Sequence, residues 1–220
     1  MCFNKEISLT TFIVASIISI LFYLRNKPND RLIAIFNFSI GLMQLAEYFI
    51  WLNINNKEKN KFYTRIAKLI YSLHPIVILF AFYFLGSLNI NKSILVYPII
   101  FGLFYTIYLI INVFTDYNLT TISKINKHLS WNGKNYSNFL TLIHYIYYGS
   151  VIILLPLLIK PFKNGIIFFS LISITALFSY LKTRNELSFN DKESWKSLWC
   201  NIGNICAIIF YIYTSYIQKK

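Results

Sequence analysis

The chain has 220 residues, a length that suits one domain, and 56% of them are hydrophobic and 19% aromatic. Only 13% are charged, which excludes an ordinary water-soluble domain, where long apolar runs are rare. The formal net charge of +13 would suit a nucleic-acid binder, but here the Lys and Arg residues flank apolar stretches instead of lining one folded face. We therefore predict an integral membrane protein that contacts the lipid bilayer and has no nucleic-acid partner.

Seven stretches are long and apolar enough for a helix to cross a hydrocarbon core of roughly 30 Å. Unsatisfied backbone groups are costly in lipid, so these spans are predicted to be helices, and the predicted fold class is an all-α bundle of about seven transmembrane helices. The bundle forms a single domain over residues 1–220, and its spans are 7–24, 32–52, 66–88, 94–114, 139–159, 165–181 and 195–217. Three of the spans contain a proline (Pro75, Pro98 and Pro156), which predicts kinks.

The longest connection, residues 115–138, contains Ile122, Ile125 and Leu129 at helical spacing. This pattern predicts either a short helix lying in the membrane interface or an ordinary surface loop. The flanking cations divide between the two sides of the membrane and do not fix the orientation of the bundle.

Polar residues at membrane depth are costly, so their positions are informative. Of eight acidic residues only Glu47 lies within a predicted span, and His74, His144 and Cys200 also lie within spans. At a rise of about 1.5 Å per residue, Glu47 and His144 lie about 8 Å and His74 about 12 Å from the same membrane boundary. Because successive helices reverse direction, all four side chains fall in the leaflet on the N-terminal side.

The faces of the helices agree with this placement. The second span carries one stripe of polar and small residues at i, i+4, i+7, i+10 and i+14, and Cys200 and Asn204 share a face of the last span. The members of the stripe are Asn37, Gly41, Gln44, Glu47 and Trp51.

Carboxylate, imidazole and thiolate groups together form the ligand set of zinc-like divalent metals. A metal site is therefore one hypothesis, although no HExxH or CxxC spacing supports it. Two alternatives stay open: a path for protons or a small solute that uses Glu47, and a scaffold in which the polar groups only join helices. The predicted ligands are Glu47, His74, His144, Cys200 and Cys2, with Gln44, Trp51 and Asn204 around them.

Two segments, Met1-Cys2-Phe3 and the stretch from Gln44 to Leu52 (QLAEYFIWL), carry a resemblance. They resemble a family of small bacterial multi-pass membrane proteins that begin MCFS and carry a Q-L-x-E-x-x-x-W-L-like stretch in the second helix. This chain has Asn4 where that family has Ser. The resemblance covers the first two helices and implies a shared fold with emphasis on Cys2, Gln44, Glu47 and Trp51. It implies no activity, and the sequence names no substrate, reaction or oligomeric state.

Overall fold

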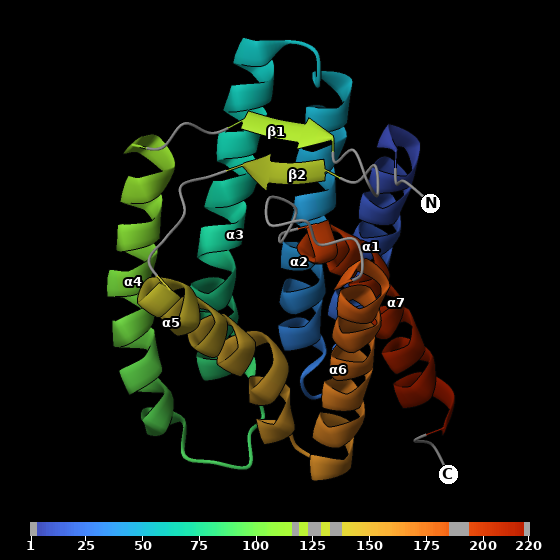
Figure 1. Cartoon of the computed structure of the whole chain (residues 1–220). Helices are drawn as coiled ribbons and strands as arrows, with labels where there is room; N and C mark the ends of the chain where they lie inside the picture. The colour runs from blue at the N-terminus through green and yellow to red at the C-terminus, as the bar shows by residue number, and fades with distance from the viewer. Residues whose placement is uncertain (1–3, 116–118, 123–128, 133–137, 185–193, 218–220) are drawn as a thin grey trace.

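A computed structural model of the chain describes residues 4–115, 119–122, 129–132, 138–184 and 194–217. Within these residues the protein is all-α, with seven α-helices and one small two-stranded antiparallel hairpin (Figure 1). The α-helices and strands are α1 (Lys5–Arg25), α2 (Asp30–Leu52), α3 (Lys57–Leu85), α4 (Val96–Thr115), β1 (Leu119–Ile122), β2 (Leu129–Asn132), α5 (Asn138–Gly149), α6 (Phe162–Arg184) and α7 (Ser194–Ile212). Four short helical turns accompany them: η1 (Lys92–Leu95), η2 (Ser150–Leu154), η3 (Leu155–Leu158) and η4 (Tyr213–Ile217).

Among the described residues, five helical segments are long and apolar enough to cross a membrane. They are α1, α2, α3, the segment Lys92–Thr115 and the segment Phe162–Lys182. The chain is thus an integral, multi-pass membrane protein. The other two predicted spans hold shorter apolar helices, Tyr145–Leu158 and Ile202–Tyr216. At about 1.5 Å per residue these two cover roughly 21–23 Å of a hydrocarbon core of about 30 Å.

The central helix of the bundle is α2, which packs against α1, α3 and α7. In the most apolar stretch of α2, 67% of the residues are buried inside the protein, against 22% in that of α1. The α1–α2 contact is close because Gly41 has no side chain: an added Cβ would lie 2.8 Å from the Cβ of Ala15. The helices α6 and α7 pack against each other, and α4 packs against the far side of α3.

The predicted third span starts too late. In the structure α3 begins nine residues earlier, at Lys57, because Asn56 caps it: the Asn56 side chain accepts a hydrogen bond from the amide of Lys59 at 3.1 Å. The added turns carry Lys and Glu residues that a hydropathy window excludes, and they extend the helix beyond the apolar run.

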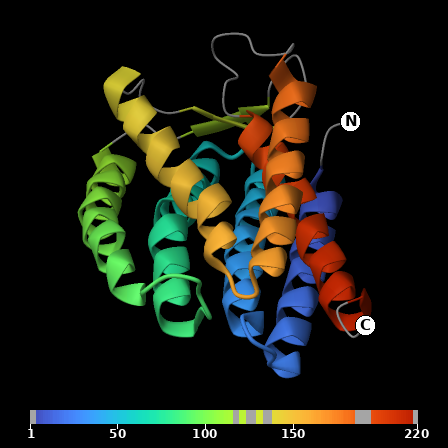
Figure 2. The same cartoon turned by 90° about the horizontal axis from the view of Figure 1, so that it is seen from below.

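The predicted continuous fifth span is also different in the structure. The helix α5 ends at Gly149, and the chain continues as the π-helical turn η2 and the 3₁₀ turn η3, which contains Pro156. Proline has no amide hydrogen to donate to the preceding turn, and the regular helix here ends before Pro156, whereas α3 continues through Pro75. Figures 1 and 2 both show α5 running obliquely to the other helices.

An interfacial helix over residues 122–129 is not formed in the described residues. Ile122 ends β1 and Leu129 begins β2, and these two residues pair in the antiparallel hairpin; Ile125 lies outside the described residues. Two polar side chains of α3 hold the hairpin. The Asn60 amide donates to the carbonyl of Thr120 at 2.9 Å and accepts from its amide at 3.0 Å, while the Thr64 and Thr120 hydroxyls lie 2.7 Å apart.

Candidate functional site

A line of buried polar residues runs along the whole length of α2. Asp30, Asn37 and Gln44 follow one another at seven-residue intervals, and Glu47 comes one turn later. Each of these four side chains is at most 3% exposed. Burying a polar group in a membrane helix is costly. Four buried polar side chains along one helix therefore indicate that they have a structural or functional role together.

Two members of the line are acidic: Asp30 at the start of α2 and Glu47 near its C-terminal end. Glu47 is 2% exposed, and its Oε2 accepts a hydrogen bond from the Gln44 amide at 3.0 Å. Glu47 and Gln44 are therefore both buried in the bundle and bonded to each other. Trp51, at the end of the stripe, is only half-buried and packs against the core.

The helix α1 packs against α2, and its buried residues are mostly small or polar. The four buried residues of α1 are Ser8, Ala15, Ser19 and Phe22, which recur on one face. Asn37 of α2 joins this face, since its amide donates to the carbonyl of Ala15 and to the hydroxyl of Ser19, both at 2.9 Å.

The third wall of the junction is α7, which contacts both α1 and α2. Its buried residues Cys200 and Asn204 lie one turn apart, and the Asn204 amide donates to the carbonyl of Cys200 at 2.9 Å. Two oxygens here are buried with no hydrogen-bond partner in the part of the chain that is described, Oδ1 of Asn204 and Oγ of Ser8. The α1–α2–α7 junction, defined by these three faces, therefore keeps polar capacity that packing does not use.

His74 holds three helices together. Its Nε2 lies 2.6 Å from the carbonyl oxygen of Ser39 in α2, and its Nδ1 lies 3.0 Å from the hydroxyl of Tyr148 in α5. A carbonyl only accepts, so Nε2 carries the hydrogen; in the neutral ring Nδ1 then accepts from Tyr148. Tyr71 stacks on Tyr148 with ring centroids 4.6 Å apart. Both ring nitrogens are thus engaged in joining helices, an arrangement that favours a packing role for His74.

The predicted metal site is brought together only in part. The described residues contain no group of three or more His, Cys, Asp or Glu side chains that could hold a metal ion. Cys2 and the side chain of His144 lie outside the described residues, so the proposed set of five ligands stays a prediction. Glu47 lies on α2 and Cys200 and Asn204 on α7, which contacts α2; His74 lies on α3, which also contacts α2.

Sequence reasoning missed a buried ion pair at the opposite end of the junction. The Nη2 of Arg25 lies 2.6 Å from Oδ1 of Asp30, with side chains only 13% and 3% exposed, and its Nε lies 2.8 Å from Oδ2. Arg25 also donates to the hydroxyls of Thr214 and Ser215, and its guanidinium lies over the ring of Tyr211 at 4.5 Å. The pair therefore joins the α1–α2 turn to the end of α7.

A sequence signal for this pair exists in the turn between the two helices. Asn26 and Asn29 both adopt the left-handed conformation, with φ of 52° and 69°, which asparagine tolerates better than most residues. Two such residues between a helix-ending Arg25 and a helix-starting Asp30 fold the chain back sharply. A cavity of about 220 Å³ lies beside the pair and reaches Asn164 at the start of α6.

Comparison with protein-family models and with curated proteins finds no match for this chain. The functional argument therefore rests on the geometry of the α1–α2–α7 junction.

Proposed function

We propose that this protein is a proton-dependent membrane carrier whose proton-binding group is Glu47. The observation that carries the proposal is the buried polar stripe of α2, which extends from Asp30 at one end of the helix to Glu47 near the other. In the sequence, the leaflet opposite Glu47 offers little polarity beyond Asn37 and Ser39, which is an objection to a continuous path. The buried Arg25–Asp30 pair adds polar groups at that end and removes this objection.

The packing of the junction supports a carrier rather than an open pore. Gly41 and Ala15 approach closely between Asn37 and Gln44, where a Cβ added to Gly41 would lie 2.8 Å from the Cβ of Ala15. Towards the Arg25 end, the rings of Phe22 and Phe210 lie 6.5 Å apart, and Phe168 packs on Phe210 at 5.0 Å. A proton or solute would then cross only if α1 or α7 moved relative to α2, as alternating access requires.

Flux measurement in proteoliposomes tests the proposal. Glu47→Gln keeps an oxygen that can accept from Gln44, so it removes the titrating group with little change in volume. We expect it to abolish proton flux driven by a pH gradient, whereas Glu58→Gln, the same change at an exposed site in the first turn of α3, leaves flux as in the wild type. Equal flux in wild type, Glu47→Gln and protein-free vesicles would refute the carrier proposal.

Elemental analysis of the purified protein separates the carrier from the predicted metalloprotein. The carrier proposal expects no stoichiometric metal in either the wild type or Glu47→Gln. About one divalent metal per chain that is lost in Glu47→Gln would instead support the metal hypothesis, and Cys200, the predicted ligand on α7, would be substituted next.

We also propose that the two shorter apolar segments complete seven crossings. An odd number of crossings places the two ends of the chain on opposite sides of the membrane, and Figure 1 shows the start of α1 and the end of α7 at opposite ends of the bundle. Cysteine labelling at Lys5 and at Tyr216 with a membrane-impermeant reagent tests this. Labelling of both from the same side of the membrane would overturn the seven-crossing topology.

Membership in the MCFS family, which shares Gln44 and Glu47 with this site, stays part of the proposal.

A further inference from the structure

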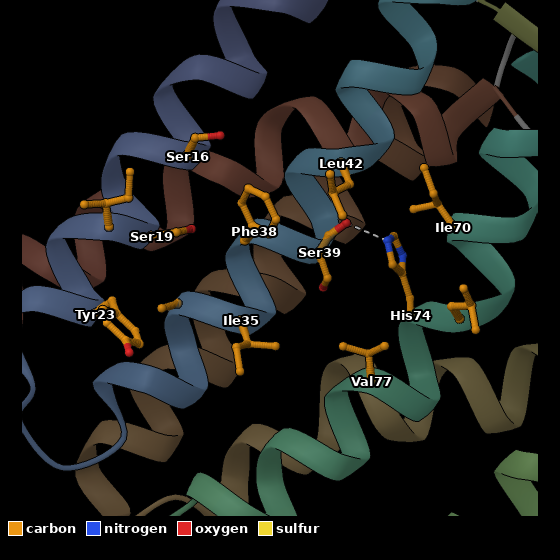
Figure 3. Close-up of a pocket in the computed structure, with 13 residues that line it drawn as sticks. Ser16, Ser19, Tyr23, Ile35, Phe38, Ser39, Leu42, Ile70, His74 and Val77 are labelled. Carbon is orange, nitrogen blue, oxygen red and sulfur yellow. Dashed lines mark hydrogen bonds between the residues drawn. The ribbon is translucent and has the colours of Figure 1, made fainter.

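An apolar groove runs along the outer face of α2 between α1 and α3, away from the α1–α2–α7 junction (Figure 3). Its volume is about 410 Å³, and its walls include Ser16 and Tyr23 of α1, Phe38 and Leu42 of α2, and Leu73 and Val77 of α3. Tyr23, Phe38, Leu73 and Val77 are between 37% and 57% exposed, so the groove opens on the surface of the bundle. In a membrane-spanning protein that surface faces lipid.

The serine and histidine side chains that border the groove already have partners within the protein. The hydroxyl of Ser16 donates to the carbonyl of Phe12 at 2.9 Å, and that of Ser19 donates to the carbonyl of Ala15 at 2.8 Å. His74 is held by Ser39 and Tyr148. An occupant therefore gains nothing from these side chains and fits only if its inserted part is apolar.

The depth of the groove matches one leaflet. Along α2 its lining extends from Ala34 to Leu42, which at about 1.5 Å per residue is roughly 12 Å. Half of a typical hydrocarbon core is roughly 15 Å. The groove therefore begins near the membrane boundary at the start of α2 and ends near the midplane, as an acyl chain does.

A cation lies at the mouth of the groove. The guanidinium of Arg31, an exposed residue in the first turn of α2, lies over the ring of Tyr23 at 5.3 Å, and Tyr23 is itself part of the groove wall. Among the described residues Arg31 makes no ion pair with a protein carboxylate. An aromatic hydroxyl and an uncompensated cation at the boundary are the groups that meet lipid headgroups and phosphates.

We propose that this groove is a binding site for one anionic phospholipid, with an acyl chain between α1 and α3 and the phosphate at Arg31. The site does not depend on Glu47 or on the carrier proposal. It would hold α1 and α3 at a fixed separation on the side of α2 that the protein itself leaves uncovered.

Native mass spectrometry of the full chain, released from nanodiscs of mixed phosphatidylglycerol and phosphatidylcholine, tests the proposal. We expect one retained phosphatidylglycerol per chain in the wild type. Arg31→Gln should lower its apparent affinity about fivefold, the effect of one cation near a lipid surface, while Lys163→Gln, which removes an exposed cation in the first turn of α6, should not.

The acyl chain is tested separately by filling the groove. Ser16→Phe places a ring in the groove and should abolish retention, whereas Ile17→Phe enlarges a neighbouring residue that is 52% exposed and does not line the groove. Val77→Phe fills the groove from α3 and replaces Ser16→Phe if that variant does not fold. Equal retention in the groove-filling variants and in Ile17→Phe would show annular lipid only and overturn the site. Equal retention of both lipids, unchanged by Arg31→Gln, would overturn the headgroup assignment.

Discussion

The Arg25–Asp30 pair should be the most sensitive polar contact of the bundle to substitution. Asp30→Ala removes the acceptor of two Arg25 hydrogen bonds, at 2.8 and 2.6 Å, and of one from the amide of Lys27 at 2.8 Å. The guanidinium would stay where it is, because Tyr211 of α7 and Thr214 of η4 still hold it.

The expected magnitude follows from burial. Removing one partner of a buried ion pair costs about 3–5 kcal/mol, because the other charge stays buried and uncompensated. Arg25 keeps hydroxyl partners and two aromatic rings, Phe22 at 5.0 Å and Tyr211 at 4.5 Å, so we expect the lower end, about 3 kcal/mol. This corresponds to more than about a hundredfold in the unfolding equilibrium.

Unfolding by SDS titration in mixed micelles, followed by circular dichroism, measures this loss. The matched control is Glu6→Ala, which breaks a surface pair whose atoms lie 3.8 Å apart and whose side chains are more than half exposed; it should cost less than about 1 kcal/mol. The double variant Arg25→Met/Asp30→Leu should cost less than Asp30→Ala, because it leaves no buried charge. If Asp30→Ala and Glu6→Ala cost the same, the pair is not a buried contact in the bilayer and the reasoning fails.

Three further predictions concern the other contacts between helices. Gly102→Ala should destabilise the bundle by about 1–3 kcal/mol, because an added Cβ would overlap the Tyr147 hydroxyl, and adding Tyr147→Phe should recover part of the loss in the same titration. Tyr148→Phe should cost about 1 kcal/mol by removing one of the two partners of His74, with no such loss in Tyr97→Phe, a residue of α4 that is 78% exposed. Asn60→Ala should release the β1–β2 hairpin from α3, visible as faster amide exchange at Thr120, while an unchanged exchange rate would contradict the role of Asn60.

Much of the fold was accessible from the sequence because hydropathy alone specifies where a chain enters and leaves lipid. The second predicted span, 32–52, differs from α2 by two residues, and the fourth, 94–114, lies within the segment Lys92–Thr115. The errors occur where hydropathy carries no information. Hydropathy did not identify Asn56 as a helix cap outside the apolar run. Hydropathy also did not reveal that the regular helix of the fifth span ends before Pro156. For the connection 115–138 the predicted alternatives were an interfacial helix and a surface loop, because helical spacing was the pattern considered; the β-branched run at residues 120–122, which lies in β1, was not used.

The candidate site divides in the same way. The stripe that includes Asn37, Gln44 and Glu47 was visible as a period along one helix, and in the structure these three residues are buried. The Arg25–Asp30 pair was not visible in the sequence. Both residues lie outside the predicted spans, and they meet only through a turn with two left-handed asparagines. The engagement of both His74 nitrogens was also beyond reach, since it depends on a carbonyl in α2 and a hydroxyl in α5.

The scaffold alternative and the carrier proposal predict different effects on flux for substitutions in the polar stripe of α2. These substitutions therefore distinguish the two. If the polar residues of α2 serve only packing, Asn37→Leu should lower stability by about 0.6–2 kcal/mol, and no proton flux should appear in the wild type or in any variant. If Glu47 carries protons, Glu47→Gln should leave the unfolding midpoint nearly unchanged, since Gln44 keeps an acceptor, while flux is lost. Asn37→Leu should do the reverse and lower stability first, because it breaks two hydrogen bonds to α1. Loss of flux without loss of stability is therefore the result that only a functional carboxylate explains.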